Sequence, residues 1–189
     1  LSARNTHPFV VDFGDHHVVM IHNGMLFDTY TLANYQHNCC GDTDSELIAM
    51  HIADVWSACS IEHRGNLLAR ALADLSRGNI DNCPQGAPPS LVELVRTKGR
   101  GLNKVNVICD DGIYLYAHTN TVEPTLYMCE KQGQVSLSTT PLDEDEWCPL
   151  ERGRVYIWNK GKRVWVSGAH DFLFEETHET TREALCSIK

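Results

Sequence analysis

The order of secondary-structure signals along the chain is the feature that most restricts its fold. Residues 9–13 and 16–21 are short runs rich in β-branched and aromatic side chains, and the turn pair Gly14-Asp15 separates them. Segments with helical spacing of apolar residues follow, and from residue 102 the pattern returns to short strands split by turns. Strands joined by tight turns pair antiparallel. The order of strands, helices and strands therefore predicts an α+β fold built on antiparallel sheets.

Cap signals and apolar spacing locate the helices. Thr43 and Glu46 form the pattern of a capping box, in which Glu or Gln follows the capping Ser or Thr by three residues. Apolar residues then recur at helical spacing, so this helix is predicted to run to about Trp56. Further helices are predicted over residues 29–35, 61–75 and 91–97, and a last short helix is capped by Thr180 and Glu183.

The second half of the chain consists mainly of short strands. They are predicted over residues 102–110, 112–118, 125–131, 134–139, 155–159 and 163–167. Glycine-containing turns indicate hairpins, at Asp110-Asp111-Gly112, Lys131-Gln132-Gly133 and Lys160-Gly161-Lys162. Residues 78–89 are rich in Gly, Pro and Asn, and they are predicted to form a surface loop within one domain.

The composition excludes several classes of protein. The 189 residues suit one domain with a single core, and 42% hydrophobic with 22% charged residues is a globular composition. A net charge of −9 argues against a nucleic-acid partner. No run approaches the roughly 18 apolar residues of a membrane span, and no export signal opens the chain. The eight cysteines form no dense disulfide framework, so we expect them to be mostly reduced and the protein to be cytoplasmic.

Histidines and cysteines near the start of the chain raise the alternative of a metal protein. They are His7, His16, His17, His37, Cys39 and Cys40. Zinc sites in sequences are typically marked by C-x-x-C pairs or by helical H-x-x-x-H pairs, and the chain has neither. We therefore predict no metal and no cofactor. A nucleophilic Cys–His pair built on Cys39 or Cys40 is a further alternative that no spacing singles out.

Asn23-Gly24 stands where the second apolar run ends, and it has two interpretations. Asn-Gly is a common hairpin turn. An Asn side-chain amide next to a backbone N–H is also a suitable pair of donors for the oxyanion that forms when an amide carbonyl is attacked. Glycine would allow close approach of the backbone and a positive φ.

Asp42 and Asp44 stand at the start of the helix that Thr43 caps. Carboxylates there interact favourably with the helix dipole, by a few tenths to about 1 kcal/mol. Alternatively, Asp44 accepts the α-ammonium group of an amino-acid substrate. The acidic run at residues 143–146 is interpreted as a solvated surface loop.

The order of these motifs resembles a known family. The series consists of Asn5-Thr6-His7-Pro8-Phe9, then His22-Asn23-Gly24, then Gly41-Asp42-Thr43-Asp44-Ser45-Glu46. It is similar to the class II glutamine amidotransferase domain of the N-terminal nucleophile hydrolases. Residues 102–117 and 137–142, with Trp147 and Gly153, are similar to its stand-alone bacterial branch. The resemblance extends to about Gly168.

The resemblance implies a fold, an activity and a set of site residues. The fold is a four-layer αββα sandwich of antiparallel sheets, and residues 1–189 are one such domain with a C-terminal tail from about 169 to 189. The activity is hydrolysis of the glutamine side-chain amide to glutamate and ammonia. Asn23 and Gly24 correspond to the oxyanion hole, Asp44 holds the substrate α-amino group, and His7 and His22 lie at the substrate.

The chain departs from the family at its start. The family nucleophile is an N-terminal Cys whose own α-amine is the general base, and residue 1 here is Leu. An H-x-R-x-A-T-type segment that binds the substrate carboxylate is also missing, and Arg4 lies too close to Asn5 to replace its arginine. We therefore expect an N-terminally truncated domain, the later part of the whole, that is inactive alone.

Several alternatives remain on the same scaffold. One is a hydrolase of larger γ-glutamyl amides, and another is a non-catalytic binding homologue. The partners implied are glutamine or a γ-glutamyl amide, and an ammonia-accepting synthase domain or subunit, with no nucleic acid and no membrane.

Overall fold

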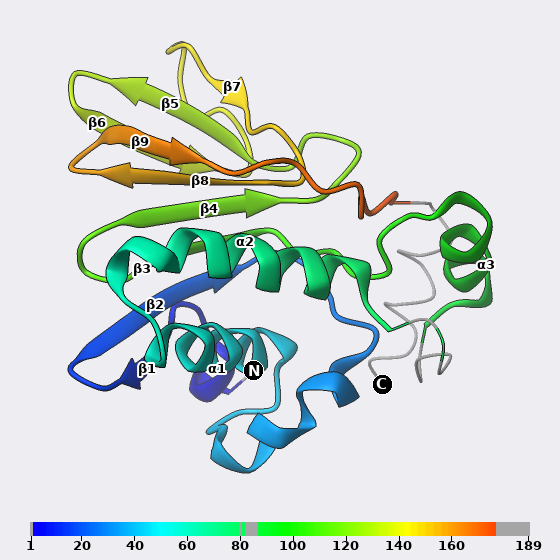
Figure 1. Cartoon of the computed structure of the whole chain (residues 1–189). Helices are drawn as coiled ribbons and strands as arrows, with labels where there is room; N and C mark the ends of the chain where they lie inside the picture. Colours follow the sequence, from blue (N-terminus) through cyan, green and yellow to red (C-terminus); the bar gives the residue numbers. More distant parts are fainter. Residues whose placement is uncertain (1, 80, 82–86, 177–189) are drawn as a thin grey trace.

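The computed structural model describes residues 2–79, 81 and 87–176 (Figure 1). Its helices are the 3-10 helices η1 (Ala3–Asn5) and η2 (Thr29–Asn38), then α1 (Asp44–Ser57), α2 (Ile61–Arg77) and α3 (Pro89–Lys98). Its strands are β1 (Phe9–Phe13), β2 (His16–His22), β3 (Val107–Asp110), β4 (Leu115–Thr119), β5 (Tyr127–Lys131), β6 (Gln134–Ser138), β7 (Cys148–Pro149), β8 (Arg154–Asn159) and β9 (Lys162–Val166). The helix expected after Thr180 lies outside the described residues.

The strands form two antiparallel sheets. The larger has six strands in the order β1-β2-β3-β4-β8-β9, and the smaller has three in the order β6-β5-β7. The predicted hairpins β1–β2, β3–β4, β5–β6 and β8–β9 are all present and antiparallel. The α+β class predicted from the order of elements is therefore confirmed.

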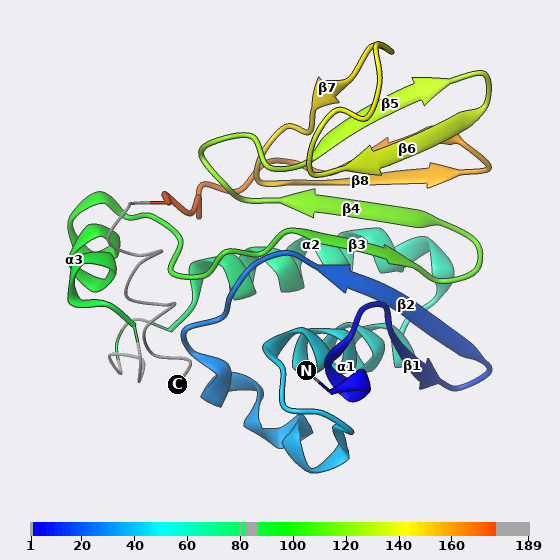
Figure 2. The ribbon, with the colours of Figure 1, turned by 180° about the vertical axis from the view of Figure 1, so that it is seen from behind.

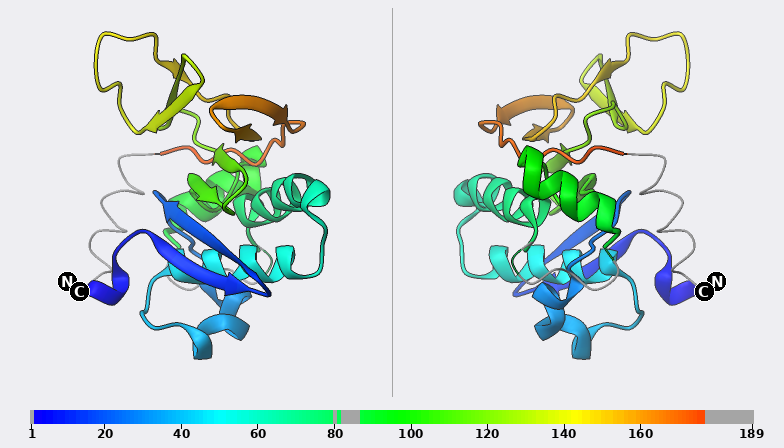
Figure 3. Two further views of the ribbon diagram at one scale, coloured as in Figure 1. Left: turned by 90° about the vertical axis from the view of Figure 1, so that its left-hand side faces the viewer. Right: turned by 90° about the vertical axis from the view of Figure 1, so that its right-hand side faces the viewer.

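Side chains that alternate along the strands of the larger sheet point to two separate hydrophobic cores, one on each face. Tyr116 of β4 and Ile157 of β8 point to the face covered by α1 and α2, where Ile48 and Ile52 are fully buried. Their neighbours point to the other face, where Tyr156 packs with residues from the three-stranded sheet. Figure 2 shows the strands in front of these helices, and Figure 3 shows the molecule from its two sides. The described residues thus form one helical layer and two sheets, with no described helix over the outer face of the smaller sheet.

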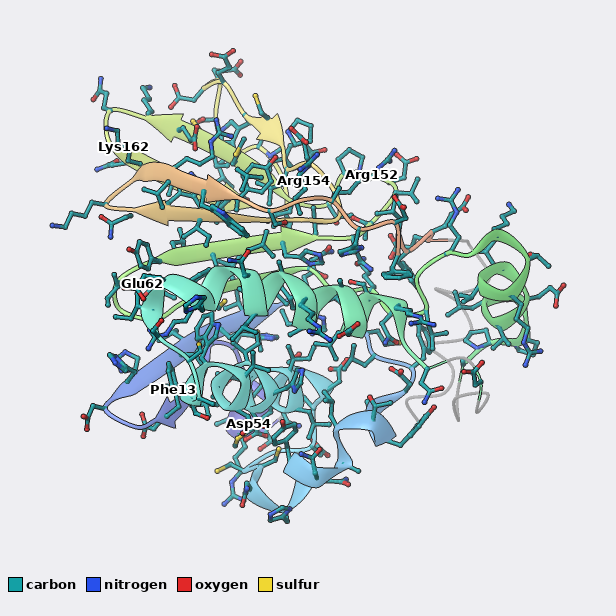
Figure 4. The ribbon with its side chains drawn as sticks, in the orientation of Figure 1. Phe13, Asp54, Glu62, Arg152, Arg154 and Lys162 are labelled. Atoms are coloured by element: carbon teal, nitrogen blue, oxygen red, sulfur yellow. The ribbon has the colours of Figure 1, made fainter. Side chains whose placement is uncertain are left out.

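A buried ion pair fastens one end of α2 to the sheet. Arg64 Nη1 lies 2.7 Å from Asp111 Oδ2, and both side chains are almost fully buried. The guanidinium also lies over the ring of Phe13, 5.1 Å from its centroid. Figure 4 shows Phe13 at this end of the molecule together with Glu62, which stands in the first turn of α2. Burial disfavours the charged carboxylate, but hydrogen bonds from Tyr114, Arg64 and others hold the pKa of Asp111 below its usual value.

The strand predicted over residues 102–110 is wrong in its first half. Regular pairing begins only at Val107. Residues 102–106 are held by side chains, by one isolated bridge between Met25 and Lys104, and by backbone hydrogen bonds to residues 23, 76 and 77. The buried Asn103 side chain accepts the N–H of Phe27 and donates to the Leu75 carbonyl. These long-range amide bonds replace a strand ladder, and periodicity along the sequence does not reveal them.

The capping box at α1 is present in part. Thr43 Oγ1 accepts the N–H of Glu46 at 3.2 Å, as predicted. The Glu46 carboxylate, however, accepts the N–H groups of Cys40 at 2.7 Å and Gly41 at 2.8 Å. Glu46 therefore closes the loop before the helix and does not return to Thr43.

Residues 168–176 follow β9 and lie against the domain. The N–H of Phe174 donates to Asn120 O at 2.7 Å, and His170 Nε2 lies 2.9 Å from His118 Nε2. The first residues of the expected C-terminal tail, up to residue 176, therefore pack against the domain. Residues 177–189 of the tail lie outside the described part. In the described part of the chain, no helix has the length and apolar composition that a membrane crossing requires.

Candidate functional site

Asn23-Gly24 is not a hairpin turn, because the chain continues beside residues 104–106. The N–H of Asn23 donates to Asn106 O at 2.9 Å, and the N–H of Met25 donates to Lys104 O at 2.9 Å. Between these two bonds, the Gly24 N–H and the Asn23 side-chain amide have no hydrogen-bond partner among the described residues. A side-chain N–H donor and a backbone N–H donor are therefore both free at adjacent positions, as an oxyanion hole requires.

Only glycine fits at position 24. A Cβ there would lie 1.9 Å from Lys104 O and 2.4 Å from His22 Nε2, far inside any normal contact. Gly24 is not among the residues with positive φ, so of the two properties that glycine offers here the left-handed conformation is not used. Close approach of the backbone to residue 104 is the reason for glycine.

His22 lies next to this corner, and its burial favours the neutral imidazole. Its Nε2 lies 3.2 Å from Lys104 O, and its Nδ1 lies 3.0 Å from Ser45 Oγ. A carbonyl only accepts, so Nε2 carries the proton and Nδ1 accepts from the Ser45 hydroxyl. Burial lowers the pKa of His22 below its usual value, against the opposing charge of Asp44. His22 therefore links β2 to the start of α1 as a neutral imidazole.

A cavity of about 250 Å³ opens beside the corner. It is lined by His7, Ile21, His22, Asn23, Asn106, Ile108, Thr125, Leu126 and Thr139. Three of the predicted site residues, His7, His22 and Asn23, are thus brought together from the end of β2, the residue that follows it and the segment before β1. Sequence reasoning did not find Asn106 or Thr125; the only signal for Asn106 was its polar side chain within the apolar run at residues 105–109, and Thr125 had none.

Asp44 is near the corner but does not line this cavity. Its Oδ2 accepts the N–H of Leu26 at 2.8 Å, and Ser45 Oγ lies 3.4 Å from Oδ1. One carboxylate oxygen thus holds the chain just after Gly24, while the other has only this long contact. The side chain remains partly exposed.

The two remaining motif segments are tied together by Asn5 and Asp42. Asn5 Nδ2 donates to the Asp42 carboxylate, and the N–H of Asp42 donates to Asn5 Oδ1 at 3.3 Å. A Cβ on Gly41 would lie 2.2 Å from Asn5 Oδ1, so glycine is needed for this contact. The segment before β1 is therefore anchored to the start of α1, close to His22 and Asp44.

No cysteine lines the cavity among the described residues. Cys39 is close to η2, where its thiol contacts Tyr35 O at 3.6 Å, and burial raises its pKa. A raised thiol pKa is opposite to that of an activated nucleophile. Within the described ranges, no three His, Cys, Asp or Glu side chains are arranged to hold a metal ion.

Comparison with known proteins gives a family and a fold. A family model described as glutamine amidotransferases class-II matches residues 1–133. No curated protein sequence matches the chain.

Three similar solved structures share the fold. A predicted glutamine amidotransferase from Pseudomonas aeruginosa PA01 is 17% identical with a TM-score of 0.56, over 86% of this chain and 66% of its own length. A class-II domain protein from Silicibacter pomeroyi is 20% identical with a TM-score of 0.54, over 91% and 73%. The glutamine phosphoribosylpyrophosphate amidotransferase from B. subtilis is 10% identical with a TM-score of 0.54, over 88% and 32%. The chain thus spans about two thirds or less of the first and third of these proteins.

Proposed function

Because the chain belongs to the class II glutamine amidotransferases, we propose that its site cleaves the side-chain amide of glutamine to glutamate and ammonia. The observation that carries the proposal is the pair of free donors at Asn23, which lines the cavity, and at Gly24 next to it. The donors are held by the backbone bonds to residues 104 and 106, so they need no rearrangement when negative charge develops on the carbonyl oxygen.

The proposed nucleophile is the N-terminal Cys of the family, located outside these 189 residues. Its thiolate attacks the amide carbon, and the carbonyl electrons move to the oxygen, which Asn23 and Gly24 stabilise. The intermediate then expels ammonia, which takes the proton that the thiol gave to the terminal amine. Water hydrolyses the thioester and releases glutamate. The 189-residue chain by itself is therefore expected to be inactive.

Asp44 is the proposed acceptor for the substrate α-ammonium group. Its Oδ1 has only the long contact with Ser45, so it retains lone pairs for a cation. Its Oδ2 accepts the N–H of Leu26, which follows Asn23 by three positions and Gly24 by two. This bond holds the carboxylate close to the oxyanion donors. We further propose that the released ammonia passes to a synthase domain or subunit.

A second candidate is the hydrolysis of γ-glutamyl amides with a larger amine group. The observation that favours it is the apolar part of the cavity wall, formed by Ile21, Ile108 and Leu126. Free ammonia needs no apolar surface, whereas an apolar amine substituent would gain about 25 cal/mol for each Å² that it buries.

A cytoplasmic location also belongs to the proposal, and the free state of the six described cysteines supports it.

The test is an amidase assay on the full-length protein expressed from its gene. Release of ammonia and glutamate is measured with glutamine, release of ammonia and aspartate with asparagine, a substrate one methylene shorter, and release of aniline and glutamate with γ-glutamyl anilide. The proposal predicts turnover of glutamine over asparagine, and faster turnover of the anilide would favour the second candidate. A folded full-length protein that releases neither product would contradict both and leave the non-catalytic homologue.

A further inference from the structure

The candidate oxyanion corner is supported by a closed ring of hydrogen bonds on the far side of Asn106. Thr119 Oγ1 donates to Asn106 Oδ1 at 2.7 Å, and Asn106 Nδ2 donates to Thr125 Oγ1 at 2.9 Å. Thr121 Oγ1 completes the ring, at 3.2 Å from Thr119 Oγ1 and 2.6 Å from Thr125 Oγ1. Each member is thus bonded to two others.

The ring determines the position of every hydroxyl proton. Each Thr hydroxyl has a single proton to donate. Because Thr119 gives its proton to Asn106, Thr121 must donate to Thr119. Thr125 must then donate to Thr121, and it accepts from Asn106. The ring is therefore fully satisfied, and loss of one hydroxyl removes one hydrogen bond from each of its two neighbours in the ring.

Three of the four ring members are deeply buried, and the ring reaches the cavity through Asn106 and Thr125. Asn106 is 4% exposed, and Thr119 and Thr121 are 2% and 3% exposed. The carbonyl of Asn106 accepts the N–H of Asn23, and its side chain lines the cavity. Thr119 and Thr121 do not line the cavity. A change at either of them can therefore affect the oxyanion donors only through Asn106 and Thr125 or through general stability.

We propose that Asn106 is a positioning residue for Asn23 and Gly24, and that Thr119, Thr121 and Thr125 fix its side chain for this role. The role rests on the proposed function, in which the two donors stabilise the transition state. Groups that act only in the transition state change kcat more than KM. Loosening the ring therefore lowers kcat, with KM nearly unchanged.

The experiment compares T119V with T119S in the full-length protein. Valine removes the hydroxyl at similar volume, and serine keeps it. T119V is expected to lower kcat for glutamine about 10-fold with KM within about twofold, since removal of a whole oxyanion donor costs roughly 10²–10³. T119S should retain most of the activity. S167A removes another buried hydroxyl, which lies outside the ring, and it should leave kcat unchanged.

A second measurement does not depend on catalysis. In ¹⁵N–¹H spectra, the amide signal of Gly24 should shift in T119V and stay in place in T119S and S167A. If T119V does not fold, T121V opens the same ring at the next position. A folded T119V with unchanged kcat and an unmoved Gly24 signal would overturn the inference, as would equal loss of kcat in S167A.

The two proposals fail in different ways. If the wild-type full-length protein releases no ammonia or glutamate from either substrate, the proposed function fails. The Gly24 signal alone then decides whether the ring positions the corner.

Discussion

Substitution of Gly24 by alanine tests the central geometry of the site without any assay of activity. The new Cβ would meet Lys104 O at 1.9 Å and His22 Nε2 at 2.4 Å. Neither neighbour is free to move, because Lys104 O accepts from both Met25 N and His22 Nε2. The clash must therefore be relieved by displacement of the backbone, which breaks at least one of these hydrogen bonds.

The magnitude follows from those contacts. Overpacking costs typically 1–3 kcal/mol, and loss of a buried hydrogen bond adds roughly 1 kcal/mol or more. We expect G24A to lower the free energy of unfolding by about 3 kcal/mol. For a domain of this size, that corresponds to a fall of about 6–12 °C in Tm.

Urea and thermal denaturation of the 189-residue chain provide the measurement. G168A is the matched control, because a Cβ at Gly168 meets nothing within 4 Å and its φ is not positive. G168A should change the free energy of unfolding by less than about 0.5 kcal/mol. A similarly small change in G24A would refute the close packing of Gly24 against residue 104.

Three further predictions concern charge and protonation. D111N leaves the buried Arg64 without its counter-charge and should cost about 3 kcal/mol or more in denaturation; equal stability would contradict the role of the pair. Burial of His118 lowers its pKa to about 3, so the unfolded chain binds a proton at this residue at a higher pH than the folded protein does. Stability should fall by up to about 1.4 kcal/mol per pH unit as the pH drops from about 6.5 towards 3, and H118Q should flatten that slope. In the full-length protein, D44N should raise KM for glutamine about 10-fold or more, since an ammonium contact is lost; an unchanged KM would remove Asp44 from the substrate.

Local patterns predicted most of the elements correctly. The runs at residues 9–13 and 16–21 became β1 and β2 because alternation is a local property of a half-buried strand. The helix opened by Thr43 was found for the same reason, since its cap and apolar spacing lie within a few turns. The antiparallel pairing of neighbouring strands could be predicted as well, because short turns join them.

Long-range contacts account for what the sequence did not predict. The strand expected at residues 102–106 fails because Asn103 bonds to residues 28 and 75, far away in the chain. The need for glycine at position 24 depends on Lys104, 80 positions later, whose carbonyl approaches the backbone. Pairing over such separations leaves no periodic signal.

The central claim is that Asn23 supplies half of an oxyanion hole. The most direct test is the kinetics of N23A in the full-length protein with glutamine as substrate. Asn23 is exposed and its side chain has no hydrogen-bond partner among the described residues, so the substitution should leave the fold intact. We predict that kcat falls by roughly 10²–10³ with little change in KM. A kcat within about threefold of the wild-type value, in a protein of unchanged Tm, would contradict the claim.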